Sequence, residues 1–134
     1  MNTAEAKSLV RSLIDAFRSR EPAGRLAELL TPDYVQHAPG GEVTKGVTAM
    51  VADVVEMFSA FADFTPTIEL QVAEGDLVAT RVRWRGTHTG DFGPVGATGR
   101  SVGVTVTRID RIDRGRVAES WLEYDPNSLV RQIS

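Results

Sequence analysis

Two histidines, His37 and His88, are the side chains of this sequence best suited to moving a proton near neutral pH. His88 ends an alternating polar–apolar stretch, immediately before a glycine-rich segment, and His37 precedes the sequence Ala-Pro-Gly-Gly. We predict that His88, assisted by His37, is the acid–base group of a catalytic site or polarises a carbonyl group. For both residues the alternative is a structural histidine that is bonded to a loop or exposed to solvent.

The residue types favour chemistry without a metal or a thiol. The sequence has no cysteine, so a disulfide, a thiolate nucleophile and a thiolate ligand are excluded. A catalytic zinc ion needs about three protein ligands. The two histidines show neither the HxH nor the HxxxH spacing, and we therefore expect no metal site.

Length and composition indicate a single domain over residues 1–134. Hydrophobic residues make up 42% and charged residues 25%, which is typical of a globular protein. The net charge of −3 gives no reason to expect nucleic acid or an anionic membrane as a partner. No apolar stretch approaches the roughly 18 residues of a membrane span, and charged residues interrupt any signal-peptide pattern. We expect a soluble, cytoplasmic protein.

The first half of the chain has the apolar spacing of helices. A stripe from Leu9 to Phe17 predicts a first helix, and Pro22 suits the first turn of a second. Thr31-Pro32 is expected to end the second helix. A short strand at Tyr34–His37 and a third helix from about Val47 to Phe61 follow.

The second half alternates with the period of two that is typical of strands. Strands are predicted at residues 67–72, 78–88 and 117–123, and Val102, Val104 and Val106 start another strand before the turn at 113–115. Turns at 74–76 and 113–115 and a glycine-rich hairpin loop, Gly90–Gly99, separate them, and a short helix follows Asp125-Pro126. Helices followed by strands predict an α+β domain, in which a curved antiparallel sheet is covered on one face by the N-terminal helices.

The alternation divides the strand at 78–88 into two faces. Trp84 and His88 share a face with Val78 and Val82, so we expect His88 at the rim of a cavity if that face is concave. The opposite face carries three arginines, Arg81, Arg83 and Arg85. We expect these arginines to pair with acidic residues on neighbouring strands or across a dimer interface.

Three further charged residues have both a structural and a functional interpretation. Asp125 precedes a proline and a helical stretch, which favours a helix cap over an acid–base role. Arg108 and Asp110 share the face of the apolar residues before them, so they could orient a water molecule or an oxyanion. The alternative, which we favour, is that the strand has left the core there and both side chains are solvated.

Four stretches resemble the SnoaL-like polyketide cyclase family, within the nuclear transport factor two-like superfamily. They are Thr31–His37, Gly86–Phe92, Ala97–Arg100 and the segment from Glu119-Ser120-Trp121 to Leu129–Ile133. The resemblance covers nearly the whole chain and implies a cone-shaped sheet closed by helices around a ligand cavity, with a homodimer packed through the outer sheet face. It also implies cavity-side histidines at the positions of His37 and His88. Relatives include cyclases that close aromatic rings by an intramolecular aldol reaction without a metal or an organic cofactor, so we expect no cofactor.

One position departs from the pattern of the aldol cyclases. In those enzymes an acid–base aspartate directly follows the tryptophan of the last strand, whereas here Leu122 follows Trp121. A leucine cannot transfer a proton. The chain therefore keeps the scaffold and lacks the best-attributed catalytic group of the cyclases.

An aromatic-lined pocket with few polar groups suits a hydrophobic ring system. The candidate substrate-binding residues, each equally suited to a core position, are Tyr34, Phe58, Trp84, Leu122 and Tyr124.

We therefore predict a cofactor-independent enzyme of the cyclase or isomerase type, which acts on a small hydrophobic, polyketide- or ester-like molecule by proton transfer. The first alternative, which Leu122 favours, is a non-catalytic protein that binds a small molecule on the same scaffold. The second is an interaction domain whose cavity is filled by side chains.

Overall fold

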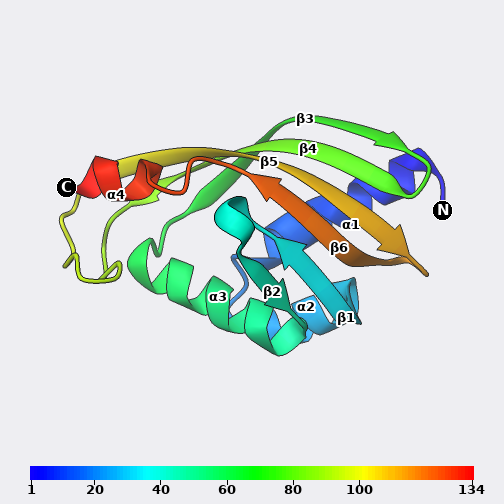
Figure 1. Ribbon diagram of the computed structural model, residues 1–134, viewed down its shortest axis with the longest axis horizontal. Coiled ribbons are helices and arrows are strands. Elements are labelled where there is room, and N and C mark those ends of the chain that lie inside the picture. Colours follow the sequence, from blue (N-terminus) through cyan, green and yellow to red (C-terminus); the bar gives the residue numbers. More distant parts are fainter.

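A computed structural model, which describes residues 1–134, shows helices packed on one face of a six-stranded sheet (Figure 1). The helices are α1 (Thr3–Ala16), α2 (Pro22–Leu29), α3 (Val47–Ala60) and α4 (Ser128–Ile133), with a 3₁₀ turn at Pro39–Gly41. The strands are β1 (Leu30–His37), β2 (Val43–Lys45), β3 (Thr65–Glu74), β4 (Leu77–Thr87), β5 (Ser101–Asp113) and β6 (Arg116–Glu123). The predicted α+β class is confirmed. None of the helices has the length and apolar content needed to cross a membrane.

The N-terminal helix forms where the apolar stripe predicted it. Its start is fixed by a capping box, in which Asn2 Oδ1 accepts the backbone N–H of Glu5 at 2.8 Å and the Glu5 carboxylate accepts the N–H of Asn2 at 3.3 Å. Val10, Leu13 and Ile14 are fully buried against the sheet. Burial of this stripe, rather than intrinsic helix propensity, holds α1 in place.

The second and third helices also lie close to their predicted positions. Pro22 occupies the first turn of α2, where its missing N–H costs nothing. The chain turns directly into β1 at Leu30, four residues earlier than the predicted strand at Tyr34–His37. α3 ends at Ala60, one residue before the predicted end.

The sheet has the strand order β2-β1-β6-β5-β4-β3. Neighbouring strands are antiparallel, as predicted, except that β1 runs parallel to β6. A parallel pair needs a long crossover connection, and here α3 and the β3–β5 meander supply it. The alternation within each strand does not reveal this pairing, because it depends on how the chain returns.

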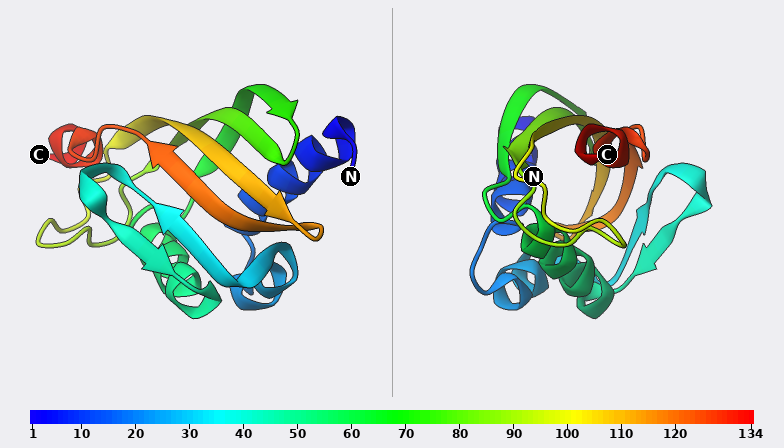
Figure 2. Two further views of the ribbon diagram at one scale, coloured as in Figure 1. Left: turned by 45° about the vertical axis from the view of Figure 1, so that its right-hand side comes forward. Right: turned by 90° about the vertical axis from the view of Figure 1, so that its left-hand side faces the viewer.

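The sheet curves around the side on which α1, α2 and α3 lie (Figure 2). Val78 and Val82 of β4 point to this concave side and are buried. Register shifts between Ile68 and Leu70 on β3, and between Arg111 and Ile112 on β5, add to the curvature. The curvature makes room for a cavity between sheet and helices.

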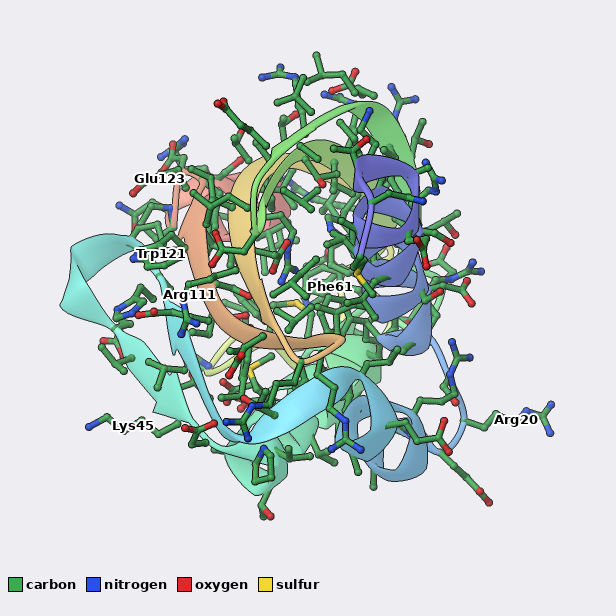
Figure 3. The ribbon with its side chains drawn as sticks, turned by 90° about the vertical axis from the view of Figure 1, so that its right-hand side faces the viewer. Arg20, Lys45, Phe61, Arg111, Trp121 and Glu123 are labelled. Atoms are coloured by element: carbon green, nitrogen blue, oxygen red, sulfur yellow. The ribbon has the colours of Figure 1, made fainter.

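The outer, convex face of the sheet exposes an apolar band. Strand register places Trp121 of β6 beside Ile109 of β5, and Ile109 beside Ala79 of β4. Leu70, Val72, Leu77, Ile109 and Trp121 are all exposed large hydrophobic residues. Figure 3 shows Trp121, Arg111 and Glu123 pointing away from the interior, whereas Phe61 lies inside. Arg81 forms the predicted cross-strand ion pair, with Glu69 at 3.0 Å.

Candidate active site

A cavity of about 430 Å³ lies between the concave face of the sheet and helices α1 and α3. Fifteen of its 21 lining residues are hydrophobic. Four of the candidate substrate-binding residues, Phe58, Trp84, Leu122 and Tyr124, are among them. Trp84 and Phe58 meet edge to face, with ring centroids 6.1 Å apart. This volume and lining suit a small, largely apolar ligand.

One cation, Arg108 of β5, lines the cavity. Its side chain is only 4% exposed, and two of its N–H groups form a fork on Asp110, with Nε to Oδ2 at 2.9 Å and Nη2 to Oδ1 at 2.8 Å. The guanidinium also lies over the ring of Phe17, 5.5 Å from its centroid. The expectation that Arg108 and Asp110 are solvated is wrong, because β5 is still over the core at these positions, where Asp110 is fully buried and Arg108 packs against Phe17.

A hydrogen-bonded chain continues from this pair into β6 and β1. Ser120 Oγ donates to Asp110 Oδ1 at 2.5 Å, and the Tyr34 hydroxyl donates to Ser120 Oγ at 2.8 Å. Asp110 and Ser120 are fully buried. Tyr34 is also fully buried and does not line the cavity, but its hydroxyl lies 3.4 Å from Oε1 of Gln36, which does line it.

Burial and charge together set the protonation states of this network. Burial alone lowers the pKa of Arg108, but the adjacent Asp110 carboxylate raises it above its usual value, so the guanidinium is charged. Burial raises the pKa of Tyr34 despite the nearby Arg108, so its phenol stays protonated and donates to Ser120.

The Arg108 fork leaves one edge of the guanidinium free. Its hydrogen bonds use Nε and Nη2, and Nη1 has no partner in the protein. Because Arg108 lines the cavity, Nη1 can donate to an oxygen atom of a ligand. A charged donor among apolar walls is suited to an enolate or alkoxide oxygen.

The mouth of the cavity is acidic. Asp53 and Glu56 of α3 and Asp125 after β6 line it, and all three are exposed. Asp53 accepts a hydrogen bond from Thr44 Oγ1 at 2.9 Å. The pKa of the Tyr124 hydroxyl is raised by burial and then by the negative charges of Asp53 and Glu42. The acidic residues at the mouth were not predicted to line a cavity, because isolated acids on an exposed helix face carry no sequence signal.

Asp125 has the structural role that the sequence favoured, in a modified form. Its Oδ1 accepts the N–H of Asn127 at 3.0 Å, and its Oδ2 forms an ion pair with Arg131. The hydrogen bond from Arg131 lowers the pKa of the Asp125 carboxyl. Asp125 therefore stabilises the turn that leads into α4, although Asn127, not Asp125, is the N-cap residue.

His88 is buried on the predicted face of its strand, but it does not line the cavity. Its Nδ1 accepts the backbone N–H of Thr98 at 3.1 Å and lies 2.9 Å from Thr98 Oγ1. Its ring packs against Phe61, with centroids 5.4 Å apart. His88 therefore holds the loop that follows β4, which agrees with the structural alternative.

Two glycines bring this loop close to the end of α3. The N–H groups of Thr89 and Gly90 both donate to the carbonyl of Ala60, at 2.9 and 3.0 Å. A Cβ atom on Gly90 would lie 2.0 Å from the carbonyl oxygen of Ser59, and one on Gly86 would lie 2.7 Å from the ring of Phe64. Gly90 therefore permits a close approach of the loop to the end of α3, and Gly86 permits a close approach of β4 to Phe64.

His37 lies on the outer face of the sheet. Its Nε2 is 2.7 Å from Glu119 Oε2, and its ring stacks on Trp121, with centroids 5.6 Å apart. The strand neighbour Gln36, which points the other way, lines the cavity instead. The structure therefore brings neither histidine into the cavity, and the two are not brought together.

No group of three or more His, Cys, Asp or Glu side chains in the chain could hold a metal ion.

The chain matches the family model of SnoaL-like polyketide cyclase over residues 7–133. Among solved structures it is similar to IdmH of Streptomyces antibioticus, a proposed polyketide cyclase, with 32% identity, a TM-score of 0.83 and 95% of this chain and 96% of that chain covered. TsrD of Streptomyces laurentii is 27% identical, with a TM-score of 0.84 and 100% and 98% covered. A proposed SnoaL-like polyketide cyclase from Jannaschia sp. CCS1 is 22% identical, with a TM-score of 0.90 and 98% and 93% covered. No curated protein matches significantly. The extent of the family match, over almost the entire chain that builds the cavity, shows that this protein belongs to the SnoaL-like polyketide cyclase family.

Proposed function

We propose that the protein is a cofactor-independent enzyme of the cyclase type, which binds a small hydrophobic ketone or ester with its carbonyl oxygen on Arg108. The observation that carries the proposal is the free Nη1 edge of a buried, charged guanidinium in an otherwise apolar cavity. Membership of the cyclase family and the likeness to IdmH support the general reaction type.

In this proposal Arg108 stabilises the negative charge that develops when a carbonyl compound loses its α-proton. A carboxylate at the mouth, Asp53 or Glu56, accepts that proton. The enolate carbon then attacks a second carbonyl of the same molecule, and the proton returns to the alkoxide oxygen. No electrons are exchanged, so the step needs no redox cofactor. The proton-transfer roles predicted for His37 and His88 are not part of this proposal, because neither side chain lines the cavity.

Leu122 favours a second candidate, a non-catalytic binding protein. Leu122 lies directly beside Arg108 in the β5–β6 register and lines the cavity. An apolar side chain next to the only cation of the lining leaves no proton acceptor in the inner part of the cavity. Such a pocket retains an oxygen-bearing hydrophobic ligand without changing it.

The experiment uses 2-tetralone, a bicyclic ketone, and tetralin, its hydrocarbon counterpart. Binding is followed by NMR at the indole N–H of Trp84, which Trp121→Phe distinguishes from that of Trp121. We expect the ketone to bind about tenfold tighter or more, as for a hydrogen bond to a charged group. We expect the preference to vanish in the double variant Arg108→Met/Asp110→Leu. Equal binding of the two compounds by the wild-type protein would contradict the proposal.

Exchange of the α-protons of 2-tetralone for deuterium separates the two candidates. An enzyme that stabilises an enolate accelerates this exchange, and the Asp53→Asn/Glu56→Gln variant slows it. A binding protein leaves the exchange at the rate of the buffer alone. The assay needs no knowledge of the natural substrate.

We also propose that two copies of the chain pair through the outer sheet face. The exposed apolar band on this face, centred on Ile109 and Trp121, supports the pairing. We expect the wild-type protein to sediment as a dimer and Trp121→Glu to sediment as a monomer. A wild-type monomer at micromolar concentration would contradict the proposal.

A further inference from the structure

We propose that Gln36 is a specificity-determining residue, which presents its side-chain carbonyl oxygen to the cavity and accepts a hydrogen bond from a hydroxyl group of the ligand. The inference rests on the proposed function, because it concerns a second group on the ligand whose carbonyl oxygen lies on Arg108. It narrows the substrate class to ketones and esters that also carry a hydroxyl group.

The first observation is the number of protons along the buried chain that ends at Gln36. The Asp110 carboxylate, held by the charged Arg108, can only accept, so Ser120 Oγ at 2.5 Å donates its single proton to it. The Tyr34 hydroxyl must then supply the proton of its own 2.8 Å hydrogen bond to Ser120 Oγ. A phenol has one proton, so the Tyr34 oxygen can only accept a hydrogen bond from any further neighbour.

The second observation is that this further neighbour is the amide of Gln36. Its Oε1 lies 3.4 Å from the Tyr34 hydroxyl oxygen, so two oxygen atoms meet there without a proton between them. A half-turn of the amide exchanges its oxygen and nitrogen with almost no change of shape, and hydrogen bonding decides between the two orientations. With Nε2 towards Tyr34 the amide donates to the phenol oxygen, and Oε1 turns away from it. Only this orientation places a donor opposite the phenol oxygen.

The third observation is the place of Gln36 in the cavity wall. Gln36 lines the cavity, and its side chain forms no other hydrogen bond within the protein. Only β6 separates the strand of Gln36 from that of Arg108, which puts the two backbones roughly 10 Å apart. Side chains converge on the concave face of a curved sheet, so one two-ring ligand can reach both residues.

The ligand therefore meets a donor and an acceptor that the same hydrogen-bonded chain holds in place. Arg108 Nη1 donates to a carbonyl oxygen, and Gln36 Oε1 accepts from a second group. A carbonyl or ether oxygen cannot donate to this acceptor, whereas a hydroxyl group can. A neutral hydroxyl suits the amide, which carries no charge to balance a cation. A site built to bind a hydroxyl group discriminates against the analogue that lacks the proton, because the polar group of the site is then left unpaired.

Binding measurements on the 2-tetralone scaffold test the inference. Four compounds carry a hydroxyl group on the aromatic ring, at position 5, 6, 7 or 8, and each is compared with its methoxy counterpart, which keeps the oxygen but cannot donate. Dissociation constants are measured for the wild-type protein and for Gln36→Met, which keeps the length of the side chain and removes its acceptor. Gln71→Met is the matched control, since it makes the same change at a glutamine that does not line the cavity.

Tyr34→Phe tests the orientation of the amide while Gln36 stays intact. The variant removes the phenol oxygen that holds Nε2, and Tyr34 itself does not line the cavity. The amide can then turn either end to the ligand, so we expect the preference for the hydroxyl compound to fall. Circular dichroism checks that each variant is folded.

We expect the wild-type protein to prefer at least one hydroxyl compound over its methoxy counterpart by about tenfold, as for a hydrogen bond that the methoxy compound leaves unmade. The preference should fall about tenfold in Gln36→Met, by less in Tyr34→Phe, and not at all in Gln71→Met. An unchanged preference in Gln36→Met or a full preference in Tyr34→Phe would overturn the inference, while the stronger binding of 2-tetralone over tetralin would still uphold the proposed function. If the wild-type protein does not distinguish 2-tetralone from tetralin, the proposed function and this inference both fail.

Discussion

Removing Arg108 alone should destabilise the protein far more than removing Arg108 and Asp110 together. In Arg108→Met the Asp110 carboxylate stays fully buried with only the Ser120 hydroxyl as a partner. An ion left unpaired in a buried site costs about 3–5 kcal/mol. A domain of this size has a free energy of unfolding of about 5–15 kcal/mol, so the single variant loses about a fifth of it or more.

In Arg108→Met/Asp110→Leu both charges are absent. Replacing a buried ion pair by apolar side chains of similar volume is often neutral or stabilising, by about 1–4 kcal/mol. The Ser120 hydroxyl loses its acceptor but keeps the Tyr34 hydroxyl, which limits the gain. We expect the double variant to be within about 1 kcal/mol of the wild-type protein.

Urea unfolding at pH 7 measures both variants, with circular dichroism and Trp84 fluorescence as independent probes. The coupling energy from the double-mutant cycle is expected to exceed about 2 kcal/mol. If Arg108→Met loses less than about 1 kcal/mol, the pair is solvated and the description of the cavity wall is wrong.

Three further predictions concern the loop after β4 and its attachment. Gly90→Ala should lower the free energy of unfolding by at least about 2 kcal/mol, since its new Cβ meets backbone, whereas Gly96→Ala should change it by less than about 0.5 kcal/mol; urea unfolding compares the two. His88→Asn should keep α-proton exchange of 2-tetralone, because the Asn side-chain oxygen can accept the Thr98 N–H in place of Nδ1. The Asp63 carboxylate accepts the backbone N–H of Thr87, at the end of β4, at 2.7 Å, and this hydrogen bond lowers the pKa of the carboxyl. It should therefore add stability above its ordinary pKa that is lost as the pH falls through the lowered value; comparing the stability of wild type and Asp63→Asn between about pH 5 and 2 tests this.

Each of these predictions has a contrary outcome. Gly96→Ala is the control, because its new Cβ meets no atom closer than 3.8 Å. If Gly90→Ala loses as little stability as Gly96→Ala, the loop moves away from α3 at little cost. Loss of exchange in a folded His88→Asn variant would restore the catalytic interpretation of this histidine. Parallel stability curves for wild type and Asp63→Asn would show that the carboxylate contributes nothing to the attachment of the loop. The effect at Asp63 is expected to be small, since the side chain is exposed and screened.

Strand periodicity predicted which face each side chain occupies, and it did so well for β4. Trp84 and His88 both point to the concave side, as the alternation required. The alternation could not show that Phe61, just after α3, packs beside His88, because that depends on the packing of an element that ends at Ala60. The same alternation, applied to β1, would have shown that Tyr34 and His37 cannot both face the cavity. They are three residues apart on one strand and therefore lie on opposite faces.

The position of Arg108 shows where composition misleads. Charged residues are seldom fully buried unless they are paired, and this rule favoured a solvated Arg108 and Asp110. Their spacing of two, in step with Val102, Val104 and Val106, was the contrary signal, since it puts both on the same strand face as these valines and within reach of each other. The length of β5 decides the matter, because the strand runs over Ser101–Asp113 and so keeps positions 108 and 110 on the core face.

The buried pair is best explained by what it does for a ligand. As a contribution to stability it is inefficient, because two apolar side chains would fill the same space without the cost of removing two charges from water. As a binding device it has properties that an apolar wall lacks. Asp110 holds the guanidinium in one orientation by two hydrogen bonds, and Ser120 and Tyr34 hold Asp110 in turn. The free Nη1 edge is therefore fixed before any ligand arrives, and no reorganisation is needed when negative charge develops on an oxygen beside it. A double variant that is as stable as the wild-type protein, but no longer distinguishes 2-tetralone from tetralin, would separate these two contributions in one molecule.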